Sequence, residues 1–242
     1  MQVIVSSDRM SGVEYIKNVL QEEKIFFNSL SEDYLESRFN LYIDFDEEVK
    51  STFLYRLKDL IAEVICLTYK YEFFVKKLRL KIDNNELKLA FIKSLSIYDI
   101  DADKEYIFSL NLIDKIICID GIYNFMLKGL TERWEEVAKL TNLNFHCFKS
   151  VESQILFIKY LLNTQNSKLK DVVLYCKDGK LKISDKYDKE LNFYSLLSES
   201  DGVSALFSLI WLHPENIYVK PTAEKSSLFS VVRTLFPERI LR

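Results

Sequence analysis

The chain has 242 residues, of which 48% are hydrophobic and 29% charged, and this composition is typical of a folded protein and not of a disordered one. Its 33 basic and 36 acidic residues give a net charge of −3, so the sequence lacks the basic excess of a general nucleic-acid binder. No stretch reaches the ~18 consecutive apolar residues of a membrane span, and the N-terminus lacks the pattern of a signal peptide. We therefore expect a soluble, cytoplasmic protein.

The N-terminal region predicts a small strand–helix–strand unit. Alternating residues around Val3–Val5 predict a strand, and the run Asn40–Phe45 predicts another. Between them, apolar side chains recur at helical spacing over Ser11–Glu23, which predicts a helix. We expect this unit to form a sheet of its own.

The longest pattern in the chain begins at Val49 and continues to Leu78. Apolar residues recur there at steps of three and four, which predicts an amphipathic helix of about 32 residues. Acidic residues precede its start and basic residues lie at its end, as the helix dipole favours. We expect the stripe, which includes Thr68, Tyr71 and Val75, to face the core.

The basic end of this helix is the best candidate binding site in the sequence. The residues of this basic run are Lys76, Lys77, Arg79 and Lys81. They could contact phosphate groups, while the nearby Tyr69, Tyr71 and Phe73 could stack on a base. The alternative is a solvated helix end, because the dipole favours positive charge there and the aromatic residues lie on or near the apolar stripe.

Further helices are expected in the middle of the chain. They cover Asn85–Ser94, Ala102–Asp114, a segment from Asp120 to Leu140, and Ser150–Leu162. Asp120 is expected to be the N-cap of its helix. The residues expected to face inward in that helix are Ile122, Phe125, Met126, Leu130, Val137 and Leu140. The polar run Asn163–Lys170 predicts a linker or a long turn.

After Lys170 the pattern changes to that of a small mixed sheet. The expected strands Val172–Cys176 and Leu181–Ile183 flank Asp178-Gly179, which is a strong hairpin signal. A helix, a strand, a helix and a strand are then expected over Gly202–Trp211, Asn216–Lys220, Thr222–Leu235 and Glu238–Leu241. Thr222 is expected to be an N-cap, and the short crossover between the last two strands predicts parallel pairing.

Together these elements predict an α+β fold. We expect it to be mostly helical, with a short N-terminal strand–helix–strand unit and a small C-terminal mixed sheet formed by a hairpin and a helix–strand–helix–strand segment. Residues 1–165 are expected to form a helix-rich region and residues 166–242 a small α/β module. The two regions could also pack as one unit.

The sequence lacks a convincing catalytic or metal-binding constellation. Its cysteines, Cys66, Cys118, Cys147 and Cys176, share no pair spacing, so free thiols in a reducing compartment explain them better than a zinc site. His146 and His213 are better explained by a loop and a helix end than by catalysis, and the five scattered glycines form no phosphate loop. We expect a protein that is not an enzyme, with no catalytic residue, metal or cofactor.

Several segments, taken in order, resemble the YtxC-like family of sporulation proteins from spore-forming Firmicutes. The similar segments are Ile119–Trp134, Phe157–Leu162, Asp171–Leu174, Pro214–Val219 and Thr234–Ile240. Each segment matches mainly in the spacing of its apolar residues, so the resemblance rests on the order and separation of the segments. It extends from about residue 40 to the C-terminus. The resemblance implies a link to sporulation and a soluble character, but it implies no activity and no active-site residues.

The chain departs from the family pattern at two places. Family members often carry a Cys-containing tail after the last strand, whereas this sequence ends at Arg242 without one. A His often ends the strand before the last helix, and here the corresponding residue is Lys220 or Pro221. If the family has metal or redox chemistry in that tail, we expect this protein to lack it.

Two functions follow from these observations. The first is a protein-interaction or scaffold role with an unidentified protein partner, and it predicts association through an apolar patch that salt does not weaken. The alternative, which we favour less, is a nucleic-acid-binding module that uses the basic run. It predicts binding that weakens steeply with salt and is lost when Lys76, Lys77 and Arg79 become Ala.

Overall fold

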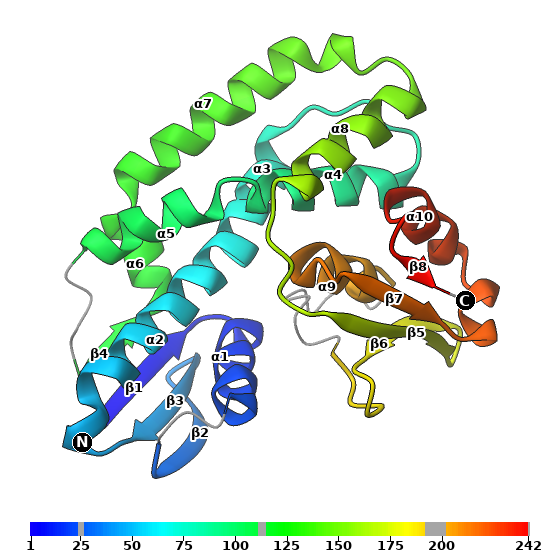
Figure 1. Ribbon diagram of the computed structural model, residues 1–242. Helices are drawn as coiled ribbons and strands as arrows, with labels where there is room; N and C mark the ends of the chain where they lie inside the picture. The colour runs from blue at the N-terminus through cyan, green and yellow to red at the C-terminus, as the bar shows by residue number, and fades with distance from the viewer. Residues whose placement is uncertain (24–26, 111–114, 192–201, 242) are drawn as a thin grey trace. The chain divides into compact units, whose positions relative to one another are not determined.

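The computed structural model describes residues 1–23, 27–110, 115–191 and 202–241, and these fold into two compact units, which we describe separately (Figure 1). Unit 1 comprises Met1–Phe73 and Asp99–Glu136, and unit 2 comprises Phe74–Tyr98 and Val137–Arg242. Each unit therefore combines two separate stretches of the chain, which differs from the expected division between residues 165 and 166. Local patterns identify elements, but they do not show which distant elements pack together. The expected α+β class is confirmed.

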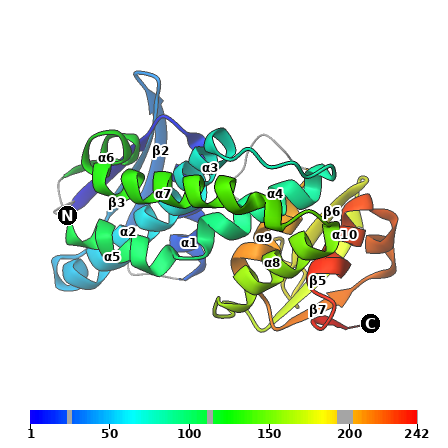
Figure 2. The same ribbon diagram turned by 90° about the horizontal axis from the view of Figure 1, so that it is seen from above.

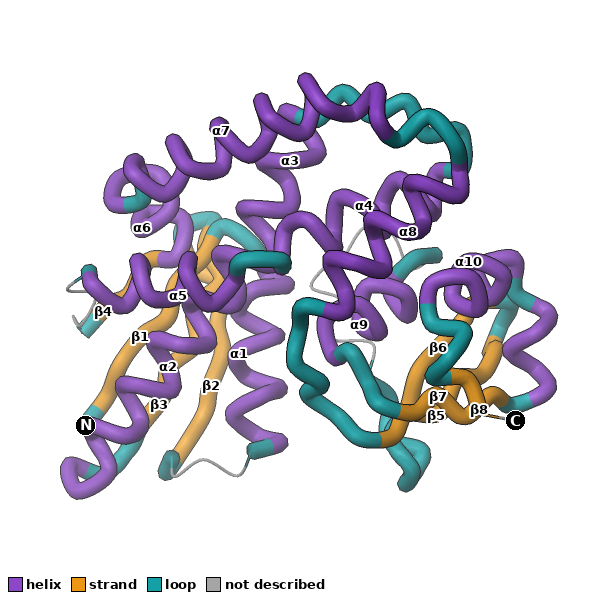
Figure 3. The backbone as a smooth tube through the Cα atoms, turned by 45° about the horizontal axis from the view of Figure 1, so that its top comes forward, coloured by secondary structure: helices purple, strands orange, loops and turns teal. Residues whose placement is uncertain are grey.

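Unit 1 is built on a sheet with the strand order β2-β3-β1-β4 (Figure 3). The expected strands are confirmed as β1 (Gln2–Ser7) and β3 (Arg38–Asp44), which pair antiparallel. A third strand, β4 (Ile116–Cys118), lies parallel to β1 on its other side. The sheet thus places the carboxyl ends of β1 and β4 next to each other.

The hairpin partner of β3 is β2 (Ser29–Leu35), which we did not predict. Glu36 and Ser37 connect the two strands with positive φ values of 52° and 64°, as a two-residue type I′ turn requires. Most side chains of β2 are exposed, so the strand lacks the apolar alternation by which a half-buried strand is recognised.

The expected first helix and the expected long helix are confirmed, and the last part of the long helix, from Phe74, belongs to unit 2. The first helix is α1 (Met10–Glu22). The long helix consists of α2 (Lys50–Val64), a π-helical segment (Ile65–Lys70) and α3 (Tyr71–Lys77). The wider turns of the π-helical segment rotate the apolar stripe, so Phe74 is buried and Val75 is 46% exposed, in contrast to the expected inward position of Val75. Figure 2 shows α2 beside α5 (Ile100–Ser109), the helix expected at Ala102–Asp114, whose predicted last residues lie outside the described chain.

The single helix expected from Asp120 to Leu140 is wrong in two respects. The chain forms α6 (Ile119–Met126) and α7 (Lys128–Asn144), which are separated at Leu127, and the N-cap of α6 is Cys118. The break changes the phase of the second helix, so Trp134 and Ala138 face the core. Ile122 and Leu130 are buried as expected. Three other residues that were expected to face inward are exposed, namely Phe125, Met126 and Leu140.

Unit 2 contains α4 (Asn85–Ile97) and α8 (Val151–Asn163), which pack against each other and match two expected helices. Ser150 is the N-cap of α8, because its hydroxyl accepts a hydrogen bond from the backbone N–H of Ser153 at 3.1 Å. The end of α7 also belongs to this unit, since the unit includes the chain from Val137 onward.

The sheet of unit 2 has the strand order β6-β5-β7-β8 and confirms the predicted C-terminal pattern. Its strands are β5 (Asp171–Lys177), β6 (Lys180–Ser184), β7 (Asn216–Val219) and β8 (Ile240–Leu241). Asp178 and Gly179 form the hairpin turn with φ values of 53° and 74°, and β7 pairs parallel with both β5 and β8.

The helices of this C-terminal region are α9 (Ser204–Leu212) and α10 (Ser227–Leu235). The expected N-cap role of Thr222 is wrong, because Thr222 lies within a 3-10 turn (Pro221–Lys225) that precedes α10. Its hydroxyl instead accepts a hydrogen bond from the backbone N–H of Cys176 at 3.3 Å.

Candidate functional site

The basic run lies in unit 2, at the end of α3 and in the extended segment that follows it. Lys76 and Lys77 occupy the last turn of α3, and Arg79 and Lys81 follow the helix. All four side chains are exposed. From Lys77 onward, exposed basic residues alternate with buried apolar residues, which are Leu78, Leu80 and Ile82. The alternation shows that the chain after α3 has one face toward the core and the basic face toward solvent.

Asn142, on the C-terminal half of α7, holds this segment in place. Its side-chain amide donates to the backbone carbonyl of Lys77 at 3.0 Å, and its carbonyl oxygen accepts from the backbone N–H of Arg79 at 2.8 Å. These backbone groups lie at the helix end, where intrahelical partners run out. The side chains of Arg79 and Lys81 therefore project from a fixed backbone, and neither forms an ion pair with a carboxylate in the described part of the chain.

The expected aromatic partners of the basic run are not available for stacking. Tyr69 and Tyr71 are buried in unit 1. Phe73 is half-buried in the same unit, where its ring makes an edge contact with Trp134 at a centroid distance of 5.8 Å. The structure therefore keeps the cationic part of the predicted site and removes its base-stacking part.

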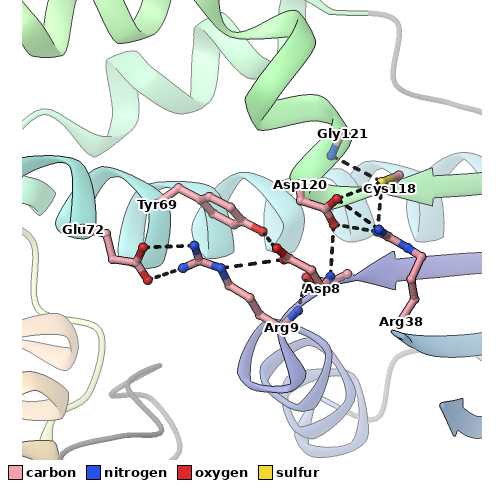
Figure 4. Close-up of polar contacts among 9 residues, drawn as sticks. Asp8, Arg9, Arg38, Tyr69, Glu72, Cys118, Asp120 and Gly121 are labelled. Carbon is pink, nitrogen blue, oxygen red and sulfur yellow. Dashed lines mark hydrogen bonds and ion pairs between the residues drawn. The ribbon is translucent and has the colours of Figure 1, made fainter. Parts of the chain in front are cut away.

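Sequence reasoning missed a polar cluster at the carboxyl ends of the parallel strands β1 and β4 (Figure 4). We call it the edge cluster, and its residues are Asp8, Arg9, Arg38, Tyr69, Glu72, Cys118 and Asp120. In open α/β sheets, the carboxyl ends of parallel strands are the usual place for a ligand. The cluster was not predicted because β4 is too short to show a strand pattern.

Asp120 is the centre of the edge cluster. Its two carboxylate oxygens accept hydrogen bonds from the guanidinium of Arg38 at 2.6 and 3.1 Å, and one of them also accepts from the backbone N–H of Asp8 at 3.1 Å. Burial alone would raise the pKa of Asp120, but these hydrogen bonds outweigh it and lower that pKa. Asp120 thus joins the loop after β1 to the start of α6.

Cys118 supplies a thiol to the cluster, but its surroundings do not activate it. The sulfur accepts hydrogen bonds from Gly121 N–H at 3.3 Å and from Arg38 at 3.0 Å. Burial raises the pKa of the thiol, and the neighbouring charge of Asp120 acts in the same direction. The thiol is therefore protonated near neutral pH, whereas a nucleophilic cysteine needs a lowered pKa.

The remaining charges of the edge cluster are also paired. Arg9 forms a bidentate ion pair with Glu72, and its guanidinium lies 4.3 Å from the centroid of the Tyr69 ring. The hydroxyl of Tyr69 donates to Asp8 at 3.3 Å. In the described ranges, no group of three or more His, Cys, Asp or Glu side chains could hold a metal ion. The cluster is best explained as a structural network that holds the loops at this sheet edge together.

Neither histidine belongs to the basic run or to the edge cluster. His146 is exposed, and its Nδ1 lies 2.8 Å from the carbonyl oxygen of Leu143. His213 is buried, with a left-handed backbone (φ 45°) at the end of α9. Burial, together with the charge of Arg239, lowers the pKa of His213 to about 4. The ring is therefore neutral at pH 7, so the predicted stabilisation of a charged histidine by the helix dipole does not apply.

An apolar surface is present in unit 2 on α8 and at the end of α4. We call it the α8 patch, and its residues are Leu156, Tyr160 and Tyr98. Leu156 and Tyr160 are 65% and 55% exposed, and they lie one helical turn apart on the same face. The Tyr160 ring lies 6.5 Å from the Tyr98 ring and 6.3 Å from the Phe157 ring, measured between centroids. The Phe157 ring in turn lies 4.6 Å from the Phe148 ring, measured between centroids, so an aromatic cluster adjoins the patch.

Comparisons of the chain with protein-family models, with curated proteins and with solved structures find no match. The resemblance to the YtxC-like family therefore stays a prediction. Among the described residues, no helix is long and apolar enough to cross a membrane.

Proposed function

We propose that this protein is a soluble, cytoplasmic, sporulation-associated protein that is not an enzyme and works by binding a protein partner. The link to sporulation rests on the family resemblance. The observation that supports partner binding is the α8 patch, where a leucine and two tyrosines are exposed side by side. Contiguous exposed apolar side chains mark interaction sites, and tyrosine is enriched in interfaces.

The packing beside the patch supports the same proposal. The half-buried rings of Phe157 and Phe148 pack against each other and beside Tyr160, so Tyr160 is presented from a packed helix and not from a loop. A surface that is ordered before binding loses less conformational entropy when a partner docks. The patch is therefore suited to form the centre of an interface.

The test is an affinity purification of the tagged protein from sporulating cells, with nuclease and high salt in the wash. We expect a specific protein partner to be retained by the wild type and lost with Leu156→Asp, which places a charge in the patch. Asn163→Asp is the matched control, because it adds the same charge at an exposed position of the same helix. Equal recovery with both variants, or recovery that depends on nucleic acid, would contradict the proposal.

A second candidate function is nucleic-acid binding by the basic run. One observation favours it, namely that Asn142 fixes the backbone from which Arg79 and Lys81 project. The net charge of −3 and the burial of the expected stacking residues Tyr69 and Tyr71 weigh against it. We therefore place it second to partner binding.

A further inference from the structure

Unit 1 contains an open groove that the functions above do not use. The groove has a volume of about 570 Å³ and is lined by residues of the first half of α2 and the end of α5. These two helices contact each other, and Figure 2 shows them side by side. Its apolar lining comes from Leu54, Tyr55 and Phe108, and the Tyr55 and Phe108 rings lie 5.1 Å apart. Small-molecule sites are typically apolar concavities of roughly 300–1,000 Å³, so the groove has a suitable size.

A lysine ammonium lies at the edge of this apolar lining. The Nζ atom of Lys58 donates to the backbone carbonyl of Phe108 at 2.8 Å and lies 5.6 Å from the centroid of the Phe108 ring. No carboxylate pairs with Lys58 in the part of the chain that the structure describes. A lysine has three N–H donors, so two of them remain for a ligand.

The other charged groups of the groove largely cancel. Lys50 lines the groove and forms an ion pair with Glu47 at 3.2 Å, and Glu47 is also part of the lining. The lining therefore contains two ammonium groups, those of Lys50 and Lys58, and one carboxylate, that of Glu47. The net charge of the groove is one positive charge, which lies at Lys58. An anion with an apolar body would therefore satisfy both the charge and the surface of the groove, whereas a cation would not.

We propose that this groove binds a single-chain amphipathic carboxylate of the fatty-acid class. The apolar chain lies against Leu54, Tyr55 and Phe108, and the carboxylate accepts hydrogen bonds from the ammonium of Lys58. This site is independent of the α8 patch, which belongs to unit 2. The proposal therefore adds a ligand to the partner-binding function and does not depend on it.

Calorimetric titration of the full chain with decanoate tests the proposal, with decyltrimethylammonium as a cationic ligand of equal chain length. We expect decanoate to bind roughly tenfold more tightly than the cation, because only the anion gains a charge-assisted hydrogen bond. Failure of decanoate to bind the wild type, or equal affinity for both amphiphiles, would overturn the proposal.

Variants locate the site. Lys58→Gln keeps an N–H donor near the Phe108 carbonyl but removes the charge, so it should weaken decanoate binding roughly tenfold and should not weaken binding of the cation. Its control is Lys88→Gln, which changes a half-buried helix lysine of unit 2 and should have no effect. Unchanged decanoate affinity in Lys58→Gln would contradict the assignment.

A second pair of variants tests the shape of the groove. Ser51 lines the groove and is exposed, so Ser51→Trp should fill the space and weaken both amphiphiles. Thr52 is exposed on the same turn but does not line the groove, so Thr52→Trp should bind like the wild type. Equal binding by the two variants would contradict the site. Normal decanoate binding by Leu156→Asp would separate this proposal from partner binding.

Discussion

Lys70 and Asp103 form an ion pair inside the core of unit 1. The Nζ atom of Lys70 lies 2.6 Å from the Oδ2 atom of Asp103, and the two side chains are 1% and 0% exposed. The indole of Trp134 donates to the same carboxylate oxygen at 3.1 Å, and Lys70 also pairs with Asp99. Burial alone would lower the pKa of Lys70, but the charges of the two aspartates outweigh it and raise that pKa. Lys70 is therefore charged in the core and depends on these partners.

Replacing Lys70 by Met should lower the free energy of unfolding by about 3–5 kcal/mol, because the Asp103 carboxylate would remain buried without its cation. The double variant Lys70→Met/Asp103→Asn should be more stable than Lys70→Met alone, since the asparagine is uncharged and can still accept from Trp134. Urea unfolding at neutral pH measures both values. A double variant that is less stable than the single variant would contradict this explanation.

Gly121 should not tolerate a side chain. A Cβ atom at this position would lie 2.9 Å from the sulfur of Cys118, the N-cap of α6. We expect Gly121→Ala to destabilise the protein by about 1–3 kcal/mol through this overlap. The control is Gly202→Ala, because nothing lies within 4 Å of a Cβ atom there. Thermal unfolding compares the two variants, and Cys118→Ala should restore part of the stability of Gly121→Ala.

His213 should make the folded state sensitive to acid. The pKa of its ring is lowered to about 4 from the ordinary value of 6.5, so the unfolded chain binds the proton more readily than the folded chain. Stability should therefore be intact above pH 6.5 and decrease as the pH falls toward 4, by about 1–3 kcal/mol. His213→Asn keeps a residue type that tolerates positive φ and should remove this component. Urea unfolding at several pH values checks it, and parallel pH profiles would refute the assignment.

The basic run makes a prediction that tests the second candidate function. If it binds single-stranded nucleic acid, the logarithm of the binding constant should fall linearly with the logarithm of salt concentration. Replacing Lys76, Lys77 and Arg79 by Ala should reduce that slope by about 0.7 for each phosphate that the protein no longer neutralises. Fluorescence anisotropy with a labelled oligonucleotide measures the slope.

The fixed backbone of this segment provides a more specific test. Asn142→Ala changes no charge but removes both hydrogen bonds that hold the turn. We expect it to weaken oligonucleotide binding several-fold, since the basic side chains would then project from a less ordered backbone. Lys88→Ala, which removes a positive charge elsewhere in unit 2, should have little effect. An oligonucleotide that does not bind, or that binds independently of salt, would exclude this function.

Local chemistry accounts for the elements that the sequence predicts correctly. Asp178-Gly179 predicts its hairpin because both residues accept positive φ, and the turn has that geometry. Regular apolar spacing likewise predicts α1, α4 and α8. The phase after Leu127 could not be predicted in the same way, since no proline marks the break between α6 and α7 and the nearby Gly129 lies within the first turn of α7.

The edge cluster could not be predicted because it depends on pairing across the chain. Asp8 and Asp120 meet only because β1 lies beside β4, which is far away in the sequence. A three-residue strand such as β4 carries too little pattern to indicate its partner. The side chains of the basic run are exposed, but the burial of the expected stacking residue Tyr69 depends on the tertiary packing of unit 1 and has no local signal.

The interleaved order of the two units affects how the chain can fold as it leaves the ribosome. The helix α4 is synthesised between the two stretches of unit 1, yet the rest of its own unit begins only at Val137. Leu87 and Phe91 are buried in the folded protein, but they cannot pack against α8 until α8 has been translated. At ordinary elongation rates this delay is on the order of seconds. During that interval α4 presents an apolar face to which chaperones, or neighbouring nascent chains, can bind.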